Sequence, residues 1–362
     1  MPDKKRTKIL ITGGAGFIGS NLVDHFLEKN FEVVCLDNLS TGYEHNISHN
    51  FPNPNFTFMK GDLRDLEICK DAVTGCDYVT HQAALGSVPR SIADPINTNS
   101  VNIDGFLNML VVARDAHIKR FVYAASSSTY GDSKKLPKVE HEIGKPLSPY
   151  AITKYVNELY AEIFATTYGM QCIGLRYFNV FGKRQDPNGA YAAVIPLWVQ
   201  KLINYESPVI NGDGSYSRDF TYVENVIDAN EKALFTSSEK IVEGQKEYYN
   251  LDVNTSEIGQ TQNQYEGECF SEVFNIAYGE NTSLLELFEI LRNYLSKFDK
   301  KIGDIKASFG PIRNGDIPHS QASILKAKVL LGYSPKFNAL SGFERTAEWY
   351  FGAQKNAVTS NK

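Results

Sequence analysis

A tyrosine and a lysine four residues apart, Tyr150 and Lys154, are the pair in this sequence best suited to acid–base chemistry. Ser148 can cap a helix and Pro149 suits a first helical position, so both side chains should lie on one helix face. A phenol has a pKa of about 10 in water and needs a nearby cation to act as a base near neutral pH. The Lys154 ammonium would provide that cation. The spacing therefore predicts a general base at Tyr150, although such a pair in isolation usually belongs to a plain helix surface.

Three consecutive serines, Ser126, Ser127 and Ser128, follow an apolar run at residues 120–125 that is typical of a strand. Ligands of open α/β sheets bind at the carboxyl ends of the strands. A hydroxyl there can relay a proton between Tyr150 and a substrate hydroxyl. We therefore predict Ser126 as a third catalytic residue, with an ordinary polar turn as the alternative.

A glycine-rich turn separates an apolar run at residues 8–12 from a helical pattern at residues 17–29, and it contains Gly13, Gly16, Phe17, Ile18 and Gly19. Glycines let the backbone bend sharply, let N–H groups approach a pyrophosphate, and let the helix pack close to the sheet. The spacing differs from the common Gly-x-Gly-x-x-Gly pattern. A tight turn without a ligand is therefore the alternative.

Two aspartates, each at the end of a predicted strand, indicate which dinucleotide this turn would bind. Asp37-Asn38 closes the predicted strand at 32–37, about 20 residues beyond the turn, where a carboxylate can bind the adenosine ribose hydroxyls. An arginine there would favour NADP, so Asp37-Asn38 predicts NAD. Asp62-Leu63 follows the predicted strand at 55–60 and suits a contact with the adenine edge, with an ordinary loop aspartate as the alternative.

The elements that must position these residues alternate between strand and helix through the first half of the chain. Strands are predicted at 8–12, 32–37, 55–60, 78–82 and 120–125, and helices at 17–29 and 99–117. This order predicts an α/β fold: a Rossmann-like, doubly wound parallel sheet with a smaller α/β substrate lobe near the C-terminus. We expect a cofactor domain over 1–180, with a returning segment near 215–235 that includes a strand at 218–223. The substrate lobe would occupy 181–362 and include a last helix at 340–351. A polar stretch at 240–268 predicts a loosely ordered surface insertion.

Composition excludes several other classes. The 362 residues carry a net charge of −5, so a nucleic-acid-binding surface is not indicated. The sequence contains no apolar run long enough to cross a bilayer. Its five cysteines are scattered, without the spacing of a metal site or a disulfide framework, which favours a reducing, cytoplasmic location and no bound metal.

Taken together, these motifs resemble the nucleotide-sugar epimerases of the extended short-chain dehydrogenase/reductase family over almost the whole chain. Arg176-Tyr177-Phe178-Asn179, Arg218-Asp219-Phe220 and Arg313-x-Gly-Asp316 add to the resemblance. The resemblance implies cofactor contacts from Ala83 and Tyr177 in addition to those above. It also implies substrate contacts from Ser126, Ser127, Ser128, Tyr150, Asn179, Val194, Arg218, Arg313, Asp316 and Ser320. Arginines suit a diphosphate because their planar fork matches its oxygens.

The sequence most closely resembles the members of this family that interconvert UDP-N-acetylglucosamine and UDP-N-acetylgalactosamine. Related dehydratases carry acidic residues where this chain has Ser127 and Ser128, so the general acid needed to eliminate water is missing. At the position of Ser320, a tyrosine would crowd an N-acetyl group and serine leaves room. UDP-glucose/UDP-galactose or UDP-glucuronate 4-epimerases remain alternatives, as does a non-catalytic NAD-binding regulator. The helices near 99–117 and 149–168 resemble a pair that forms a homodimer interface in this family.

Overall fold

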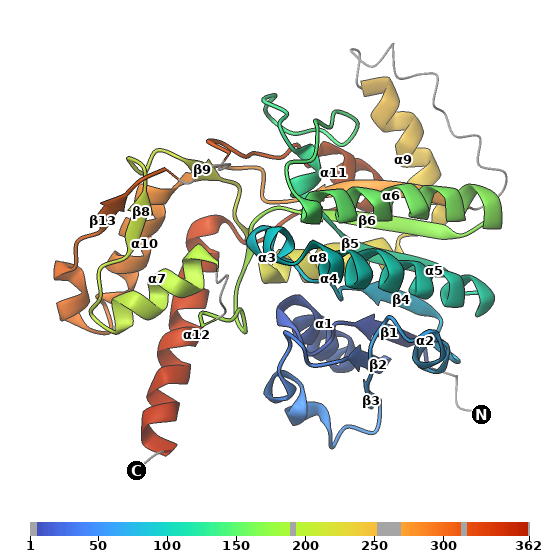
Figure 1. Cartoon of the computed structure of the whole chain (residues 1–362), viewed down its shortest axis with the longest axis horizontal. Helices are drawn as coiled ribbons and strands as arrows, with labels where there is room; N and C mark the ends of the chain where they lie inside the picture. Colours follow the sequence, from blue (N-terminus) through green and yellow to red (C-terminus); the bar gives the residue numbers. More distant parts are fainter. Residues whose placement is uncertain (1–5, 189–192, 252–268, 313–316, 361–362) are drawn as a thin grey trace.

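A seven-stranded parallel sheet forms the centre of the protein, in a computed structural model that describes residues 6–188, 193–251, 269–312 and 317–360. The strand order is β11-β6-β5-β4-β1-β2-β3 (Figure 1). The chain therefore builds outward from β1 in one direction and then, from β4, in the other, which confirms the doubly wound α/β fold. The strands are β1 (Lys8–Thr12), β2 (Glu32–Asp37), β3 (Phe56–Lys60), β4 (Tyr78–His81), β5 (Arg120–Ser126), β6 (Gln171–Tyr177) and β11 (Phe270–Ile276).

Helices cover both faces of this sheet. One face packs against α1 (Phe17–Glu28), α8 (Val223–Phe235) and α11 (Leu325–Leu331), and the other against α2 (Leu66–Val73), α5 (Gly105–Asp115) and α6 (Pro149–Tyr168). Strand β1 shows how the sequence builds the two layers. Ile9 and Ile11 belong to the first core and Leu10 to the second, because successive side chains of a strand point to opposite faces.

Two short helices and a π-helical turn lead into α5: α3 (Val88–Ala93), α4 (Pro95–Asn99) and Ser100–Asp104. Short 3-10 helices occur at Glu44–Asn46, Ser48–Asn50, Ser127–Tyr130 and Lys300–Asp304. Helix α6 begins as predicted, because the Ser148 hydroxyl accepts from the Ala151 N–H at 3.1 Å and Pro149 is the first helical residue.

The expected strand at 218–223 has to be corrected. Those residues form β9 (Ser217–Arg218) and β10 (Thr221–Tyr222), which pair outside the main sheet, and α8 already begins at Val223. Within the predicted returning segment it is therefore α8 that packs on the sheet, and the next strand added to the sheet is β11, which pairs in parallel with β6. A strand this far along the chain was not predicted.

The predicted surface insertion is also wrong for residues 240–251. Helix α9 (Ser238–Leu251) buries Ile241 and Tyr248, and Gly244 lies so close to α11 that a Cβ would come within 2.9 Å of the Leu330 Cα. Three positions spaced along one helix face thus dock a largely polar segment on the core. Residues 252–268 lie outside the described residues.

The second lobe lies beside the carboxyl edge of the sheet (Figure 1). It contains α7 (Val194–Ile203), α10 (Leu284–Leu295) and α12 (Ala339–Ser360), together with three two-stranded sheets. These sheets pair β8 (Val209–Asn211) with β13 (Ser308–Gly310), β9 with β12 (Thr282–Ser283), and β10 with β7 (Val180–Phe181). The last helix thus forms as predicted and is longer than expected. Across the described residues, no helix combines the length and hydropathy that a bilayer crossing requires.

Candidate active site

The glycine-rich turn lies between β1 and α1, at the carboxyl edge of the sheet. Gly13 has a φ of +66°, and a Cβ there would come within 2.7 Å of the Ala83 backbone. A Cβ at Gly19 would come within 2.1 Å of the Gly13 carbonyl oxygen, so this turn needs glycine at both positions. The N-cap residue Gly16 offers no side-chain acceptor. The N–H groups of the first helical turn are therefore left for an anion at the positive end of α1.

Asp37 ends β2 beside this turn. Its carboxylate accepts from the Ala15 N–H at 2.9 Å and from the Leu39 N–H at 2.8 Å, which fixes its orientation. Burial raises the pKa of Asp37, and the two backbone donors oppose that rise. A carboxylate held in this way still has lone pairs that could accept from a ribose diol, which is the role that the sequence predicts for it.

Asp62 lies nearby and is held by other side chains. It accepts from the Asn38 amide at 2.9 Å and from the Arg64 guanidinium at 2.7 and 2.9 Å. The Arg64 hydrogen bonds keep the pKa of Asp62 far below its usual range, so the group stays ionised. The structure thus brings Asp37, Asn38 and Asp62 together, as the sequence predicted.

Tyr150, Lys154 and Ser126 meet where β5 ends against the first turns of α6. Burial raises the pKa of Tyr150, and its interaction with the Ser126 hydroxyl opposes that rise. The Lys154 ammonium donates to the Ala124 carbonyl at 2.7 Å. Burial lowers the pKa of Lys154 to about 8, against the opposing effect of Glu158. Lysine therefore remains largely protonated near pH 7, which the predicted base requires.

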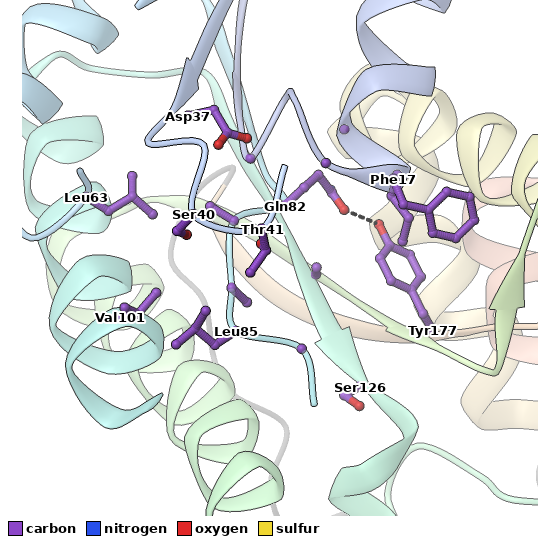
Figure 2. A pocket seen from close by; sticks show the side chains of 18 of the residues that line it. Phe17, Asp37, Ser40, Thr41, Leu63, Gln82, Leu85, Val101, Ser126 and Tyr177 are labelled. Carbon is purple, nitrogen blue, oxygen red and sulfur yellow. Dashed lines mark hydrogen bonds between the residues drawn. The ribbon is translucent and has the colours of Figure 1, made fainter. Parts of the chain in front are cut away.

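These groups line one continuous cavity of about 550 Å³. Asp37 lies toward one end and Ser126 toward the other (Figure 2). The predicted residues that line it are Gly13, Gly16, Phe17, Ile18, Gly19, Asp37, Asn38, Asp62, Leu63, Ala83, Ser126, Ser127, Tyr150, Lys154, Tyr177 and Asn179. The polar groups of the cavity fit a dinucleotide. A carboxylate lies at one end, a helix N-terminus lies in between, and an ammonium lies at the other end.

Several other predicted substrate residues lie outside the lining of this cavity, namely Ser128, Val194, Arg218 and Ser320. Ser128 instead donates to the Ser126 hydroxyl at 2.9 Å. Arg218 donates to the Ser217 and Pro318 carbonyls at 2.9 and 3.2 Å, and the Ser320 N–H donates to the Ser217 carbonyl at 3.2 Å. Arg218 and Ser320 are therefore neighbours at β9 in the second lobe. Arg313 and Asp316 lie outside the described residues.

Asp219, the middle residue of the Arg218-Asp219-Phe220 motif, organises the loops of this lobe. Its buried carboxylate accepts from the N–H groups of Tyr278, Gly279 and Ala322 at 3.1–3.2 Å. Asn179 in turn donates to the Asp219 carbonyl at 3.2 Å, which links the motif to the cavity. Burial raises the pKa of Asp219 to about 7.

Arg176 belongs to a motif that carried the family resemblance, yet it lies away from the cavity. Its guanidinium donates to both carboxylate oxygens of Glu158, at 2.9 and 2.7 Å, and to the Glu140 carbonyl. The Arg176 and Glu158 side chains are only 4% and 7% exposed, so this is a buried ion pair between β6 and α6.

Sequence reasoning missed other residues of the cavity lining, most of them single residues in loops: Ser40, Thr41, Gln82, Leu85, Gly86, Arg90, Val101, Val180 and Gln185. Only their positions after β2, β4 and β6 could have indicated them, because each of these strands ends at the binding edge. Among the described residues, no cluster of histidine, cysteine and acidic side chains could hold a metal ion.

Comparison with known proteins agrees with this site. Residues 9–251 match the NAD dependent epimerase/dehydratase family. In structure, the chain is similar to a UDP-N-acetylglucosamine 4-epimerase from Methanobrevibacter ruminantium in complex with UDP-N-acetylmuramic acid. The identity is 35% and the TM-score 0.81, and the match covers 97% of this chain and 100% of that one. It is also similar to a UDP-glucose 4-epimerase from Thermotoga maritima with UDP-glucose, at 33% identity and a TM-score of 0.79, over 96% and 100% of the two chains.

In sequence, the UDP-glucose 4-epimerase of Mycolicibacterium smegmatis is 30% identical over 350 residues, which are 95% of this chain and 98% of that one. These matches confirm the resemblance to the extended short-chain dehydrogenases/reductases and the prediction of NAD as the cofactor. With its glycine cradle, acidic ribose site and Tyr150–Lys154 pair in the cavity, the chain belongs to the NAD-dependent epimerase/dehydratase family of nucleotide-sugar enzymes.

Proposed function

We propose that this protein interconverts UDP-N-acetylglucosamine and UDP-N-acetylgalactosamine by epimerisation at C4, through a transient 4-keto sugar. The observation that carries the proposal is that the half-buried Tyr150 lines the cavity together with Ser126 and lies one helical turn from the buried Lys154. This arrangement can remove and return a hydroxyl proton. The predicted cofactor and substrate contacts keep those roles in the proposed reaction.

In the proposed reaction, Tyr150 accepts the proton of the sugar 4-hydroxyl, in part through the Ser126 hydroxyl. Burial disfavours the phenolate, so its formation depends on the nearby Lys154 charge. One N–H of the ammonium is used by the Ala124 carbonyl, which leaves two donors for the ribose of the cofactor. When bound, NAD would supply the acceptor and the donor for the two hydride transfers at C4. Rotation of the keto sugar between these two transfers exposes its other face, and Tyr150 then returns the proton.

Serines at 127 and 128 argue against dehydration. Loss of water from the sugar needs a general acid for the departing hydroxyl, and these two positions offer only hydroxyl groups. The Ser128 hydroxyl is already committed to Ser126. Retention of both Tyr150 and Lys154 in the cavity argues against a non-catalytic regulator.

The choice of sugar rests on the loop at 317–320, which is tied to β9 through Ser217. Ser320 is small, and the family resemblance puts this position beside the C2 substituent of the sugar. The similar Methanobrevibacter enzyme is named for an N-acetylated sugar, which supports the proposal. A UDP-glucose/UDP-galactose 4-epimerase is the second candidate, because the similar Thermotoga and Mycolicibacterium proteins carry that name. A UDP-glucuronate 4-epimerase remains the third.

A substrate panel tests the choice of sugar. Purified protein is given UDP-N-acetylglucosamine, UDP-glucose or UDP-glucuronate without added NAD, and kcat/KM is compared for the wild type and for Ser320→Tyr. We expect the acetylated sugar to be preferred, and Ser320→Tyr to reduce its kcat/KM about tenfold or more, because overpacking costs about 1–3 kcal/mol. Turnover of UDP-glucose should be spared. An equal fall for both sugars, with NAD still bound, would remove Ser320 as the determinant.

We further propose a homodimer in the cytoplasm. On α6, Ile152, Leu159 and Ile163 are 51%, 45% and 56% exposed, and Ile96 of the neighbouring α4 is 83% exposed. Such an apolar face suits burial against a second copy. Light scattering of the purified protein should give twice the mass of one chain, and Ile163→Glu should shift it toward the monomer.

A further inference from the structure

Two amides, a phenol and a threonine form a closed hydrogen-bond ring beside the cavity. The Asn230 amide donates to the Tyr177 hydroxyl at 2.9 Å, and that hydroxyl donates to the Gln82 carbonyl oxygen at 3.1 Å. The Gln82 amide donates to Asn230 at 3.1 Å and to Thr80 at 2.8 Å. The Thr80 hydroxyl completes the ring by donating to Asn230 at 3.0 Å. Gln82 and Tyr177 line the cavity, and Asn230 and Thr80 do not.

The ring joins three elements that are not neighbours in sequence. Thr80 and Gln82 come from β4 and the residues after it, Tyr177 ends β6, and Asn230 lies on α8. Strand β5 lies between β4 and β6, so Gln82 and Tyr177 must reach each other across it. The register puts Ala124 of β5 level with Gln82, and its small side chain leaves room for this contact. Figure 2 shows the hydrogen bond between Gln82 and Tyr177 at the cavity wall.

Asn230 fixes the direction of every bond in this ring. It is fully buried, and its second amide proton goes to the Val226 carbonyl at 2.8 Å, so all of its hydrogen-bonding capacity is used. Because Asn230 donates to Tyr177, the phenol must direct its own proton to Gln82. Rotating the Gln82 amide by 180° would set its carbonyl oxygen against that of Asn230 and would leave the Tyr177 proton without an acceptor. One side chain thereby orients two cavity residues.

We propose that Asn230 is a positioning residue for NAD: it holds Tyr177 and Gln82 in the orientation in which they form the wall of the cofactor cavity. The effect on the cofactor passes through Tyr177 and Gln82, since Asn230 itself lies outside the lining. The proposal concerns the cofactor and not the choice of sugar. NAD binding can therefore test it independently of which sugar is the substrate.

The chain contains a matched control for this substitution. Asn225 lies on the same helix, is 1% exposed, and uses its amide in the same way. It donates to the Phe337 carbonyl at 2.7 Å and accepts from the Lys336 and Phe337 N–H groups. Its partners lie in the segment before α12 and outside the cavity lining. Asn225→Ala and Asn230→Ala should therefore lower the melting temperature alike and differ only in cofactor binding.

The experiment measures NAD release from the purified holoenzyme during dialysis, and NAD affinity of the stripped enzyme by calorimetry, without sugar. We expect Asn230→Ala to weaken NAD binding roughly tenfold, because Tyr177 and Gln82 lose the hydrogen bonds that hold their orientation in the cavity wall. Asn225→Ala should stay within about twofold of the wild type. Tyr177→Phe removes only the hydroxyl and should weaken NAD binding in the same direction, so it tests the proposal even where Asn230→Ala folds poorly. In the Tyr177→Phe background, Asn230→Ala should add less than about twofold.

Kinetics provide a readout that a general folding defect would not give. With Asn230→Ala, turnover should come to depend on added NAD, and the KM for NAD should rise while the KM for the sugar substrate stays unchanged. Undiminished NAD affinity in Asn230→Ala or in Tyr177→Phe would overturn the proposal. The proposal would also be overturned if Asn230→Ala weakened NAD binding as much in the Tyr177→Phe background as in the wild type. An equal loss of NAD affinity in Asn225→Ala would overturn it too.

Discussion

Glu158 lies one helical turn beyond Lys154 on α6, and its substitution by glutamine tests how the protein keeps its lysine charged. Burial lowers the pKa of Lys154 to about 8, and the negative charge of Glu158 opposes this fall. The same carboxylate is paired with Arg176 at 2.7 Å. In Glu158→Gln the opposing charge is gone, and the guanidinium of Arg176 remains. The pKa of Lys154 should therefore fall further.

The size of this fall follows from the helix geometry. Residues four apart on a helix have Cβ atoms about 5–6 Å apart, and a unit charge at ~6 Å contributes about 2.8 kcal/mol at an effective dielectric constant of about 20. That energy corresponds to about two pKa units and is an upper bound, because the ammonium extends to the Ala124 carbonyl. We expect a fall of about one unit. Since the mechanism needs a charged lysine, activity is lost as pH rises through this pKa, and the alkaline limb of kcat/KM should move about one unit lower.

The assay is the pH profile of kcat/KM with NAD occupancy measured at each pH. Stability changes too, because breaking a buried ion pair costs about 3–5 kcal/mol. Glu272→Gln controls for that cost, since Glu272 pairs with Lys326 at 2.6 Å and is equally buried, and it lies outside the cavity lining. This control should lose stability without a shift of the alkaline limb. An unmoved or higher alkaline limb in Glu158→Gln would refute the electrostatic role of this pair.

Three further substitutions test other parts of the account. Tyr150→Phe should reduce kcat about 10²–10⁴-fold while NAD stays bound, as is typical when a general base is removed, and near-normal turnover would exclude Tyr150 as the base. Asp219 has a pKa raised to about 7, so the folded state binds a proton that the unfolded state releases above about pH 4. The free energy of unfolding should therefore fall by about 1.4 kcal/mol per unit between pH 4 and 7, and chemical denaturation of Asp219→Asn should show a flatter dependence. The Tyr43 hydroxyl donates to Asp186 at 2.7 Å and joins the segments that carry Thr41 and Gln185 of the cavity lining. Tyr43→Phe should speed NAD loss on dialysis about two- to fivefold, whereas Tyr205→Phe, which removes a similar bond to Asp299 in the second lobe, should not.

Much of the sheet could be predicted because its strands are short apolar runs separated by turns. Lys8–Thr12 and Glu32–Asp37 have the predicted bounds, and the strands from Phe56, Tyr78 and Arg120 differ by one residue. Except for the edge strand β3, these runs are buried almost throughout, so their composition alone indicates strands. The last strand, β11, could not be found in this way. Only its last three residues are buried in succession, its first four alternate in burial, and its partner β6 lies far away in sequence.

Helix α9 shows where composition misleads. Most of this helix lies in the stretch 240–268, whose glutamate, glutamine, asparagine and threonine residues indicate a surface insertion. Its docking depends on two apolar side chains, Ile241 and Tyr248, and on the close approach of Gly244 to α11. These three positions form a narrow apolar stripe, and the sequence alone does not show which helix the stripe packs against.

Within the site, residues that belong to motifs were found and isolated ones were not. Gly13, Asp37 and Tyr150 have fixed spacings from a strand end or a helix start, so the sequence indicated their place in the cavity. Gln82 and Asn230 are single amides whose role depends on each other and on Tyr177. Arg176 is the opposite case. It belongs to a motif, yet its side chain forms a buried ion pair and does not line the cavity.

The fate of the C4 hydrogen tests the central claim most directly. Purified protein is given UDP-N-acetylglucosamine carrying deuterium at C4, in ordinary water and without added NAD, and the product is analysed by mass spectrometry and NMR. A site that removes and returns one hydride should give UDP-N-acetylgalactosamine with the deuterium still at C4. Loss of the deuterium to solvent, or release of NADH in proportion to product, would contradict epimerisation through a transient 4-keto sugar.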